Sequence, residues 1–200
     1  IDRDMSNSEV DKVLSSIHGY HTRGNQSLIP KRYIIEKTFL QRCPNLLAVS
    51  TGGAGYDSIV VENCTEAGVL VTNQAGLNAE AVAEHALAMM LSLTKKITQV
   101  NAAMRRDPDL ERYHFRNNDM FGKTLGIVGL GQIGARVAHI CKTAFGMDVM
   151  AVHPRITPEQ AIERNARLVD FPELLEQSDF VLVSCGLNDE TRGMFGENEF

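Results

Sequence analysis

The stretch Leu125-Gly-Ile-Val-Gly129-Leu-Gly131-Gln-Ile-Gly134-Ala-Arg-Val-Ala-His-Ile140 decides the fold of this chain. An apolar run, the spacing G-x-G-x-x-G and an amphipathic segment predict a strand, a tight turn and a helix. Gly129 permits the turn, Gly131 lets a pyrophosphate approach the backbone, and Gly134 lets the helix pack on the strand. The start of the helix attracts phosphate through its free N–H groups and its dipole. The pattern predicts a dinucleotide site, although an ordinary tight turn has the same spacing.

Size and composition narrow the class of protein. The chain has 200 residues, of which 44% are apolar, and a net charge of −5. This is enough for one large domain or two small ones. The acidic balance and the lack of a basic stripe argue against nucleic acid and anionic membranes as partners. No apolar stretch is long enough to span a bilayer, and four scattered cysteines without a C-x-x-C pair favour a reduced, cytoplasmic protein.

Strands and helices alternate along the second half of the chain. We expect strands at 125–129, 148–152, 167–169 and 180–184, and helices at 132–144, 158–165 and 171–177. Thr157 followed by proline predicts the start of the second of these helices. Apolar strands that alternate with helices predict a doubly wound parallel sheet covered on both faces.

The first half repeats this rhythm less regularly. We expect helices at 8–15, 30–41, 58–67 and 79–94, and strands at 16–19, 46–50 and 69–72. The helix at 79–94 has small and apolar residues nearly all round, which predicts a buried helix. The polar tract 105–118 separates the halves. We therefore expect two α/β domains, at residues 1–97 and 98–200.

A second glycine-rich turn, Ser50-Thr-Gly-Gly-Ala-Gly-Tyr-Asp57, lies between an expected strand and an expected helix. Its glycines leave backbone N–H groups free to form an anion nest. A tight turn that requires positive φ explains the same residues nearly as well.

Several motifs occur together in a fixed order. They are Gly53-Ala-Gly-Tyr-Asp57, Gly68-Val-Leu-Val-Thr-Asn73, Asn78-Ala-Glu-Ala-Val-Ala-Glu84, the segment 122–134, and Thr191-Arg-Gly-Met-Phe195. In this combination the chain resembles the D-isomer-specific 2-hydroxyacid dehydrogenase family over essentially all its residues. The resemblance implies a flavodoxin-like substrate domain interrupted by a Rossmann cofactor domain, the latter incomplete here. Both ends of the family's chain are expected to be missing.

The resemblance also implies roles for individual residues. Backbone N–H groups of Gly53, Ala54 and Gly55 would hold the substrate carboxylate. The expected contacts to the cofactor outside the three glycines of the motif are Asn78 and Val82 at the nicotinamide, Gln132 and Ile133 at the pyrophosphate, and Cys185, Gly186 and Thr191 along the adenosine ribose.

The implied reaction is reversible hydride transfer between a nicotinamide and a 2-keto or 2-hydroxy acid. Orientation and charge complementarity are the protein's contribution. Members of the family use an arginine, a glutamate and a histidine downstream of the motif that ends at Phe195, so we expect no catalytic residue before Phe200. Arg192 is interpreted as structural. No metal ion is expected, and the family implies a homodimer formed through the long helix.

Two departures from the family pattern bear on the cofactor. The residue that ends the second strand of the cofactor domain is His153, where NAD-preferring members have a carboxylate, and Arg155 follows. Without the carboxylate, Arg155 can pair with a 2′-phosphate, which favours NADP over NAD. A solvated Arg155 beside a histidine that only ends the strand is the alternative. Gly186 loosens a loop in which many relatives have proline.

Other functions are compatible with the same fold. The leading hypothesis is an oxidoreductase acting on glyoxylate, hydroxypyruvate or a bulkier analogue. A dinucleotide-sensing protein of the corepressor type is the alternative from another class, and phosphoglycerate or formate dehydrogenase are alternatives on the same scaffold. Fold alone does not choose among these substrates.

Overall fold

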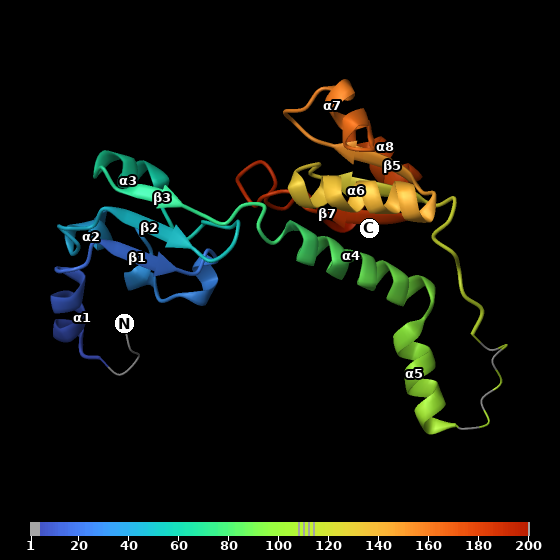
Figure 1. Ribbon diagram of the computed structural model, residues 1–200, viewed down its shortest axis with the longest axis horizontal. Helices are drawn as coiled ribbons and strands as arrows, with labels where there is room; N and C mark the ends of the chain where they lie inside the picture. The colour runs from blue at the N-terminus through green and yellow to red at the C-terminus, as the bar shows by residue number, and fades with distance from the viewer. Residues whose placement is uncertain (1–4, 108, 110, 112, 114, 200) are drawn as a thin grey trace. The chain divides into compact units, whose positions relative to one another are not determined.

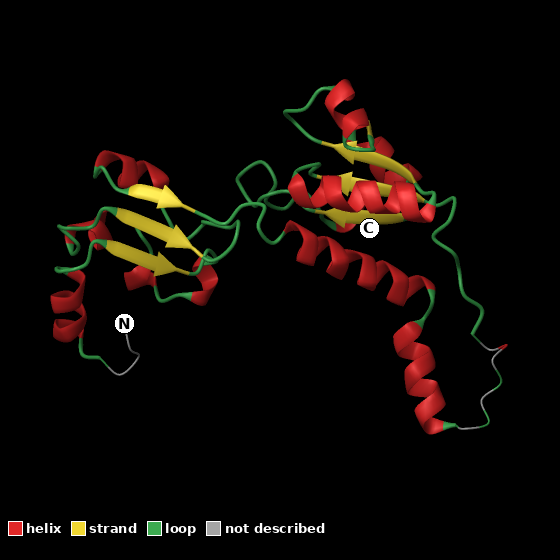
Figure 2. Cartoon of the chain, in the orientation of Figure 1, coloured by secondary structure: helices red, strands yellow, loops and turns green. Residues whose placement is uncertain are grey.

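The chain folds into two compact units, Ile1–Asn78 and Ala79–Phe200, in the computed structural model. The structure describes residues 5–107, 109, 111, 113 and 115–199. Figures 1 and 2 show that each unit has its own sheet with helices around it. No helix among the described residues is long and apolar enough to cross a membrane.

The first unit is a three-stranded sheet in the order β1-β2-β3, with all strands parallel (Figure 1). Its core is a single cluster of apolar side chains that includes Leu14, Phe39 and Val49. The elements in chain order are α1 (Asn7–Leu14), β1 (Gly19–Thr22), the 3₁₀ turns η1 (Gln26–Leu28) and η2 (Lys31–Tyr33), α2 (Lys37–Gln41), β2 (Ala48–Thr51), α3 (Val61–Glu66) and β3 (Leu70–Thr72).

Two sequence expectations for this unit were wrong. The strand expected at 16–19 begins only at Gly19, because the hydroxyls of Ser15 and Ser16 donate to carbonyls in the last turn of α1. The helix expected at 30–41 is confined to Lys37–Gln41. The Ile35 N–H donates to the Ser58 carbonyl and the Val60 N–H donates to the Ile35 carbonyl, so this stretch forms a β-bridge instead of a helical turn.

The second unit holds a four-stranded parallel sheet in the order β6-β5-β4-β7. This confirms the expected α/β fold with a parallel sheet. The elements are α4 (Ala79–Thr94), α5 (Ile97–Arg106), β4 (Thr124–Val128), α6 (Gln132–Phe145), β5 (Asp148–Val152), α7 (Pro158–Glu163), β6 (Arg167–Leu168), α8 (Phe171–Gln177), β7 (Phe180–Val183) and the 3₁₀ turn η4 (Glu197–Glu199).

Helices cover both faces of this sheet. A side chain built at Gly126 of β4 would meet Leu174 of α8, whereas the next residue, Ile127, lies against Gly134 of α6. Neighbouring residues of a strand point to opposite faces, so α6 and α8 lie on opposite sides. Thr157 accepts a hydrogen bond from the Gln160 N–H in a capping box, as expected for the start of α7.

The long helix α4 is less buried than the sequence predicts. One stripe of it is buried, through Ala83, Ala86 and Met90, and packs on the core of the second unit. The opposite side exposes Met89 and Leu93, so the helix is not buried all round. Because α4 packs against α6, the compact unit begins at Ala79, earlier than the boundary expected at residue 98.

An ion pair reinforces the packing of α4 on α6. The Arg136 guanidinium donates to both carboxylate oxygens of Glu80, over 2.6 and 2.8 Å. The tract 105–118, expected to join the domains, begins as the last turn of α5 and lies partly outside the described residues.

Candidate functional site

The glycine turn between β4 and α6 is shaped by two close approaches. Gly129 has φ +98°, and a Cβ there would lie 2.6 Å from the Cys185 nitrogen. A Cβ at Gly134 would lie 2.4 Å from the Gly129 carbonyl oxygen. Both positions therefore require glycine. A Cβ at Gly131 would meet no atom within 4 Å, so the turn is open at that residue.

Two side chains hold the carbonyl groups of this turn. The Ser184 hydroxyl donates to the Gly129 carbonyl over 2.7 Å, and Arg164 Nη1 donates to the Leu130 carbonyl over 2.6 Å. Among the residues that the structure describes, the N–H groups of Leu130 and Gly131 have no hydrogen-bond partner. Sequence reasoning missed Ser184 and Arg164, because neither lies in the glycine motif.

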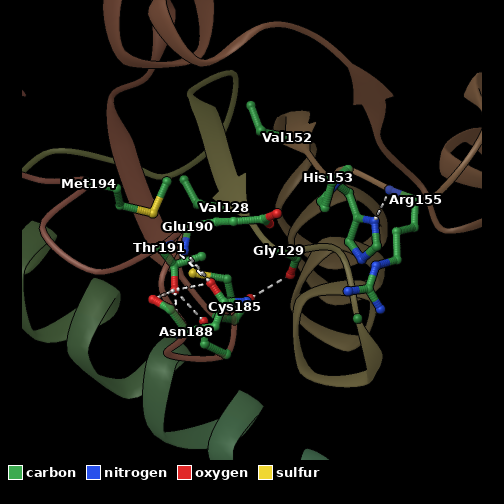
Figure 3. Close-up of a pocket in the computed structure, with 14 residues that line it drawn as sticks. Val128, Gly129, Val152, His153, Arg155, Cys185, Asn188, Glu190, Thr191 and Met194 are labelled. Atoms are coloured by element: carbon green, nitrogen blue, oxygen red, sulfur yellow. Dashed lines mark hydrogen bonds between the residues drawn. The ribbon is translucent and has the colours of Figure 1, made fainter.

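A pocket of about 450 Å³ lies beside the turn (Figure 3). In Figure 3, His153 and Arg155 lie on one side of it, Cys185 and Thr191 on the other, and Gly129 between them. The pocket brings together seven residues expected to contact the cofactor: Gly129, Gly131, His153, Arg155, Cys185, Gly186 and Thr191.

The other expected cofactor residues do not line this pocket. Gln132 and Ile133 form the first turn of α6, and Gly134 is buried there. Val82 is exposed on α4, and Asn78 is the exposed last residue of the first unit. Their contacts to the cofactor remain predictions.

His153 is held in one orientation. Its Nδ1 accepts a hydrogen bond from the Arg155 N–H over 3.1 Å. The neutral ring therefore carries its proton on Nε2 and can donate from that atom. Burial lowers the pKa of His153, and the positive charges of Arg164 and Arg155 lower it further. The guanidinium groups of Arg164 and Arg155 thus both lie near enough to the end of β5 to affect His153 electrostatically.

The loop after β7 is closed by its own polar groups. The Thr191 hydroxyl donates to the Gly186 carbonyl over 2.7 Å and accepts from the Asn188 N–H over 2.9 Å. Thr191 thereby shapes the loop next to the pocket. Cys185 is half-buried in the pocket wall, whereas the free thiols of Cys43, Cys64 and Cys141 are buried.

The second glycine turn lies in the first unit and follows β2. Gly53 has φ +135°, and a Cβ at Gly24 would lie 2.0 Å from the Gly55 carbonyl oxygen. The Gln74 N–H donates to the Gly53 carbonyl over 2.8 Å, and Asn73 Nδ2 donates to the Ala54 carbonyl over 2.9 Å. Within the described part of the chain, the N–H groups of Ala54 and Gly55 have no partner. The turn has both the positive φ and the free N–H groups that the sequence suggested.

A histidine and a serine that sequence reasoning missed lie at the same edge of the first unit's sheet. His21 and Ser50 are paired across β1 and β2, and Nδ1 of His21 lies 2.8 Å from the Ser50 hydroxyl oxygen. A Cβ at Gly52 would lie 3.4 Å from Nε2 of His21. A titratable ring therefore borders the turn that is expected to hold a carboxylate.

The matched part of the chain settles the family. Residues 87–200, more than half of the chain, match the family model of the D-isomer specific 2-hydroxyacid dehydrogenase NAD binding domain. This chain belongs to the D-isomer-specific 2-hydroxyacid dehydrogenases. All 14 residues that line the pocket lie within the segment that matches the family model.

Relatives with established names agree with this assignment. The chain is 36% identical over 166 residues to D-3-phosphoglycerate dehydrogenase of Archaeoglobus fulgidus; the match covers 83% of the chain and 31% of that relative. It is 34% identical over 171 residues to glyoxylate reductase of Thermococcus litoralis, covering 82% of the chain and 51% of that relative. The chain thus spans about a third to a half of the length of these relatives.

A solved structure matches both units. D-lactate dehydrogenase of Aquifex aeolicus, solved with NAD and lactic acid, superposes with a TM-score of 0.82 at 26% identity. The match covers 94% of this chain and 54% of the solved chain.

Proposed function

We propose that the protein is an oxidoreductase that transfers hydride between a nicotinamide dinucleotide and a 2-keto or 2-hydroxy acid, and that it prefers NADP to NAD. The observation that carries the proposal is the pocket formed by the glycine turn, the end of β5 and the loop after β7. The free N–H groups of Leu130 and Gly131 can donate to a phosphate. The positive end of the α6 dipole, at the N-terminus of that helix, also attracts a phosphate. When bound, the dinucleotide supplies or accepts the hydride.

The preference for NADP rests on the charges at the end of β5. His153 presents an Nε2–H donor, and Arg155 belongs to the same side of the pocket. Of the described residues that line the pocket, only Glu190 carries a carboxylate, and it comes from the loop after β7. A 2′-phosphate would therefore meet donors and positive charge beside β5, without the carboxylate that repels it.

The substrate carboxylate is assigned to the glycine turn of the first unit. Ala54 and Gly55 offer two adjacent free N–H groups, and His21 borders the turn. Adjacent N–H groups in such a turn bind an anion without a side-chain charge. The names of the relatives support small 2-hydroxy acids and glyoxylate as the substrate class.

The test uses the protein expressed from its complete reading frame. Dissociation constants for NADPH and NADH are measured by calorimetry, and oxidation of each is followed with glyoxylate and hydroxypyruvate. We expect NADPH to bind at least about threefold more tightly than NADH, and Arg155→Met to remove the difference. Arg106→Met, on an exposed arginine at the end of α5, is the control. A preference for NADH contradicts the NADP assignment, and tight binding without turnover favours a sensing protein.

We also propose that the protein forms a homodimer in the cytoplasm. The side of α4 opposite the core exposes Met89 and Leu93, and α5 exposes Ile97 and Met104. Large apolar side chains exposed in this number along one side of a helix are typical of an interface. The four free cysteines fit a reducing compartment. Sedimentation of the wild type and of Leu93→Glu tests the dimer, since a charge at its centre should dissociate it.

A further inference from the structure

We propose that Arg164 is a positioning residue for the dinucleotide: it holds the Leu130 carbonyl and thereby aims the Gly131 N–H at the phosphates. Arg164 lies outside the glycine motif and does not line the pocket. Its effect on the ligand would pass through the turn. The inference rests on the proposed function, because it names the residue that prepares that site for its ligand.

The geometry of the peptide bond makes the connection. The Leu130 carbonyl and the Gly131 N–H belong to the same planar trans peptide, so they point in opposite directions. Arg164 Nη1 lies 2.6 Å from the carbonyl oxygen, and the N–H on the other side has no partner among the described residues. Fixing the carbonyl therefore fixes the direction in which the free N–H points.

Arg164 is itself well anchored. It is the C-cap of α7, and its own N–H donates to carbonyls of that helix, including those of Gln160 and Ala161. The helix is fixed at its other end by the Thr157 capping box. The guanidinium is half-buried, so its hydrogen bond is less open to competition from water than an exposed one.

The peptide between Gly129 and Leu130 is held in the same way, by a weaker donor. The Ser184 hydroxyl holds the Gly129 carbonyl, which directs the Leu130 N–H away from it. A neutral hydroxyl makes a weaker bond than a guanidinium. Arg164 also carries a positive charge near the pocket: burial lowers the pKa of His153, and the charge of Arg164 lowers it further. The positioning effect therefore has to be separated from simple attraction between Arg164 and the cofactor.

The experiment measures the dissociation constant for NADH in Arg164→Met and Arg164→Lys of the complete protein, at low salt and at about 0.5 M NaCl. NADH lacks the 2′-phosphate, so it reports on the turn rather than on the end of β5. We expect Arg164→Met to weaken NADH binding about tenfold at both salt concentrations, because salt screens attraction between charges but does not restore a lost hydrogen bond. Arg164→Lys should recover part of the affinity.

Arg167→Met is the matched control. Arg167 pairs with Glu173 and Asp148 and does not contact the turn, so its loss should lower stability and leave NADH affinity unchanged. Unchanged binding in Arg164→Met overturns the inference, and so does a loss that disappears at high salt. If Arg164→Met does not fold, Arg164→Lys decides between the same outcomes. A wild-type protein that binds neither NADH nor NADPH overturns the proposed function itself, and the inference with it.

Discussion

Each unit carries a glycine turn after a strand of its parallel sheet, and the two turns expose N–H groups by the same means. In both, the carbonyls of two successive peptides are hydrogen-bonded on one side, so that the N–H groups face the other. The first unit holds them with the Gln74 N–H and the Asn73 amide. The second holds them with the Ser184 hydroxyl and the Arg164 guanidinium.

The difference lies in charge and in the following helix. The donors of the first unit are neutral, and its turn does not lead directly into a helix. In the second unit one donor is a cation, and Gly131 is the N-cap of the 14-residue helix α6. The charge-assisted bond from Arg164 holds its carbonyl more firmly than a neutral donor does, and the dipole of α6 adds an attraction for a diphosphate that the first unit lacks.

The largest expected effects come from two glycines of the same turn, one needed for stability and the other for cofactor binding. Gly129→Ala forces a Cβ against the Cys185 backbone at a φ of +98° and should cost about 3 kcal/mol of unfolding free energy. Gly131→Ala meets no protein atom within 4 Å, so it should cost less than about 0.5 kcal/mol. It should nevertheless weaken NADPH binding by about tenfold or more, because a methyl group blocks the approach of the pyrophosphate. Urea unfolding and calorimetry check both; equal loss of stability in the two variants would contradict this account.

The next effect concerns the turn of the first unit. Asn73→Asp replaces the amide that donates to the Ala54 carbonyl with a carboxylate, which repels both that carbonyl and an incoming anion. We expect KM for glyoxylate to rise about tenfold or more. Steady-state kinetics provide the measurement. Gln74→Ala is the control, since Gln74 uses its backbone N–H, and its KM should not change.

A smaller effect is expected from Ser184→Ala. Loss of one neutral hydrogen bond to the Gly129 carbonyl, worth about 1 kcal/mol, should weaken NADH binding about three- to fivefold. This loss should be smaller than that of Arg164→Met. Ser178→Ala, which removes a hydroxyl bonded to the Leu174 carbonyl of α8, should leave affinity unchanged. An effect of Ser184→Ala that exceeds that of Arg164→Met would reverse the proposed ranking of the two donors.

The smallest effect is on the pH dependence of stability. The pKa of His153 is lowered by burial and by Arg164 and Arg155, so the unfolded chain takes up this proton at a higher pH than the folded chain. Stability should therefore be complete above the ordinary histidine value of 6.5 and fall as pH drops below it. Urea midpoints from about pH 8 to about pH 5.5 provide the measurement. His153→Gln should flatten this part of the profile, and an unchanged slope would show that His153 does not contribute.

Local signals explain why the parallel sheet of the second unit was predictable. A glycine motif, a capping box at Thr157 and apolar strands all favour the same structure. In the first unit the polar ends of α1 and the bridge between Ile35 and Ile59 override the local pattern. The bridge joins residues far apart in sequence, so periodicity within the segment 30–41 could not reveal it.

In the candidate sites, too, contacts between residues far apart in sequence could not be predicted. The glycines and the end of β5 are recognisable because the chemistry lies within a short motif. The partners that hold the turns come from elsewhere: Arg164 lies 34 residues from Leu130, and Ser184 lies 55 residues from Gly129. His21 and Ser50 are 29 residues apart and meet only because β1 and β2 are neighbours. Such pairs follow from topology and not from local sequence.

The half-buried position of Cys185 makes the protein easy to follow in the laboratory. Burial raises the pKa of the Cys43, Cys64 and Cys141 thiols, for Cys141 to about 11, so these three should react slowly with a maleimide dye. Cys185 lines the pocket and should take up the dye first. Labelling of Cys185 should then slow as a dinucleotide fills the pocket. The dye signal of this native thiol would therefore report how much of the protein has ligand bound, without any engineered residue.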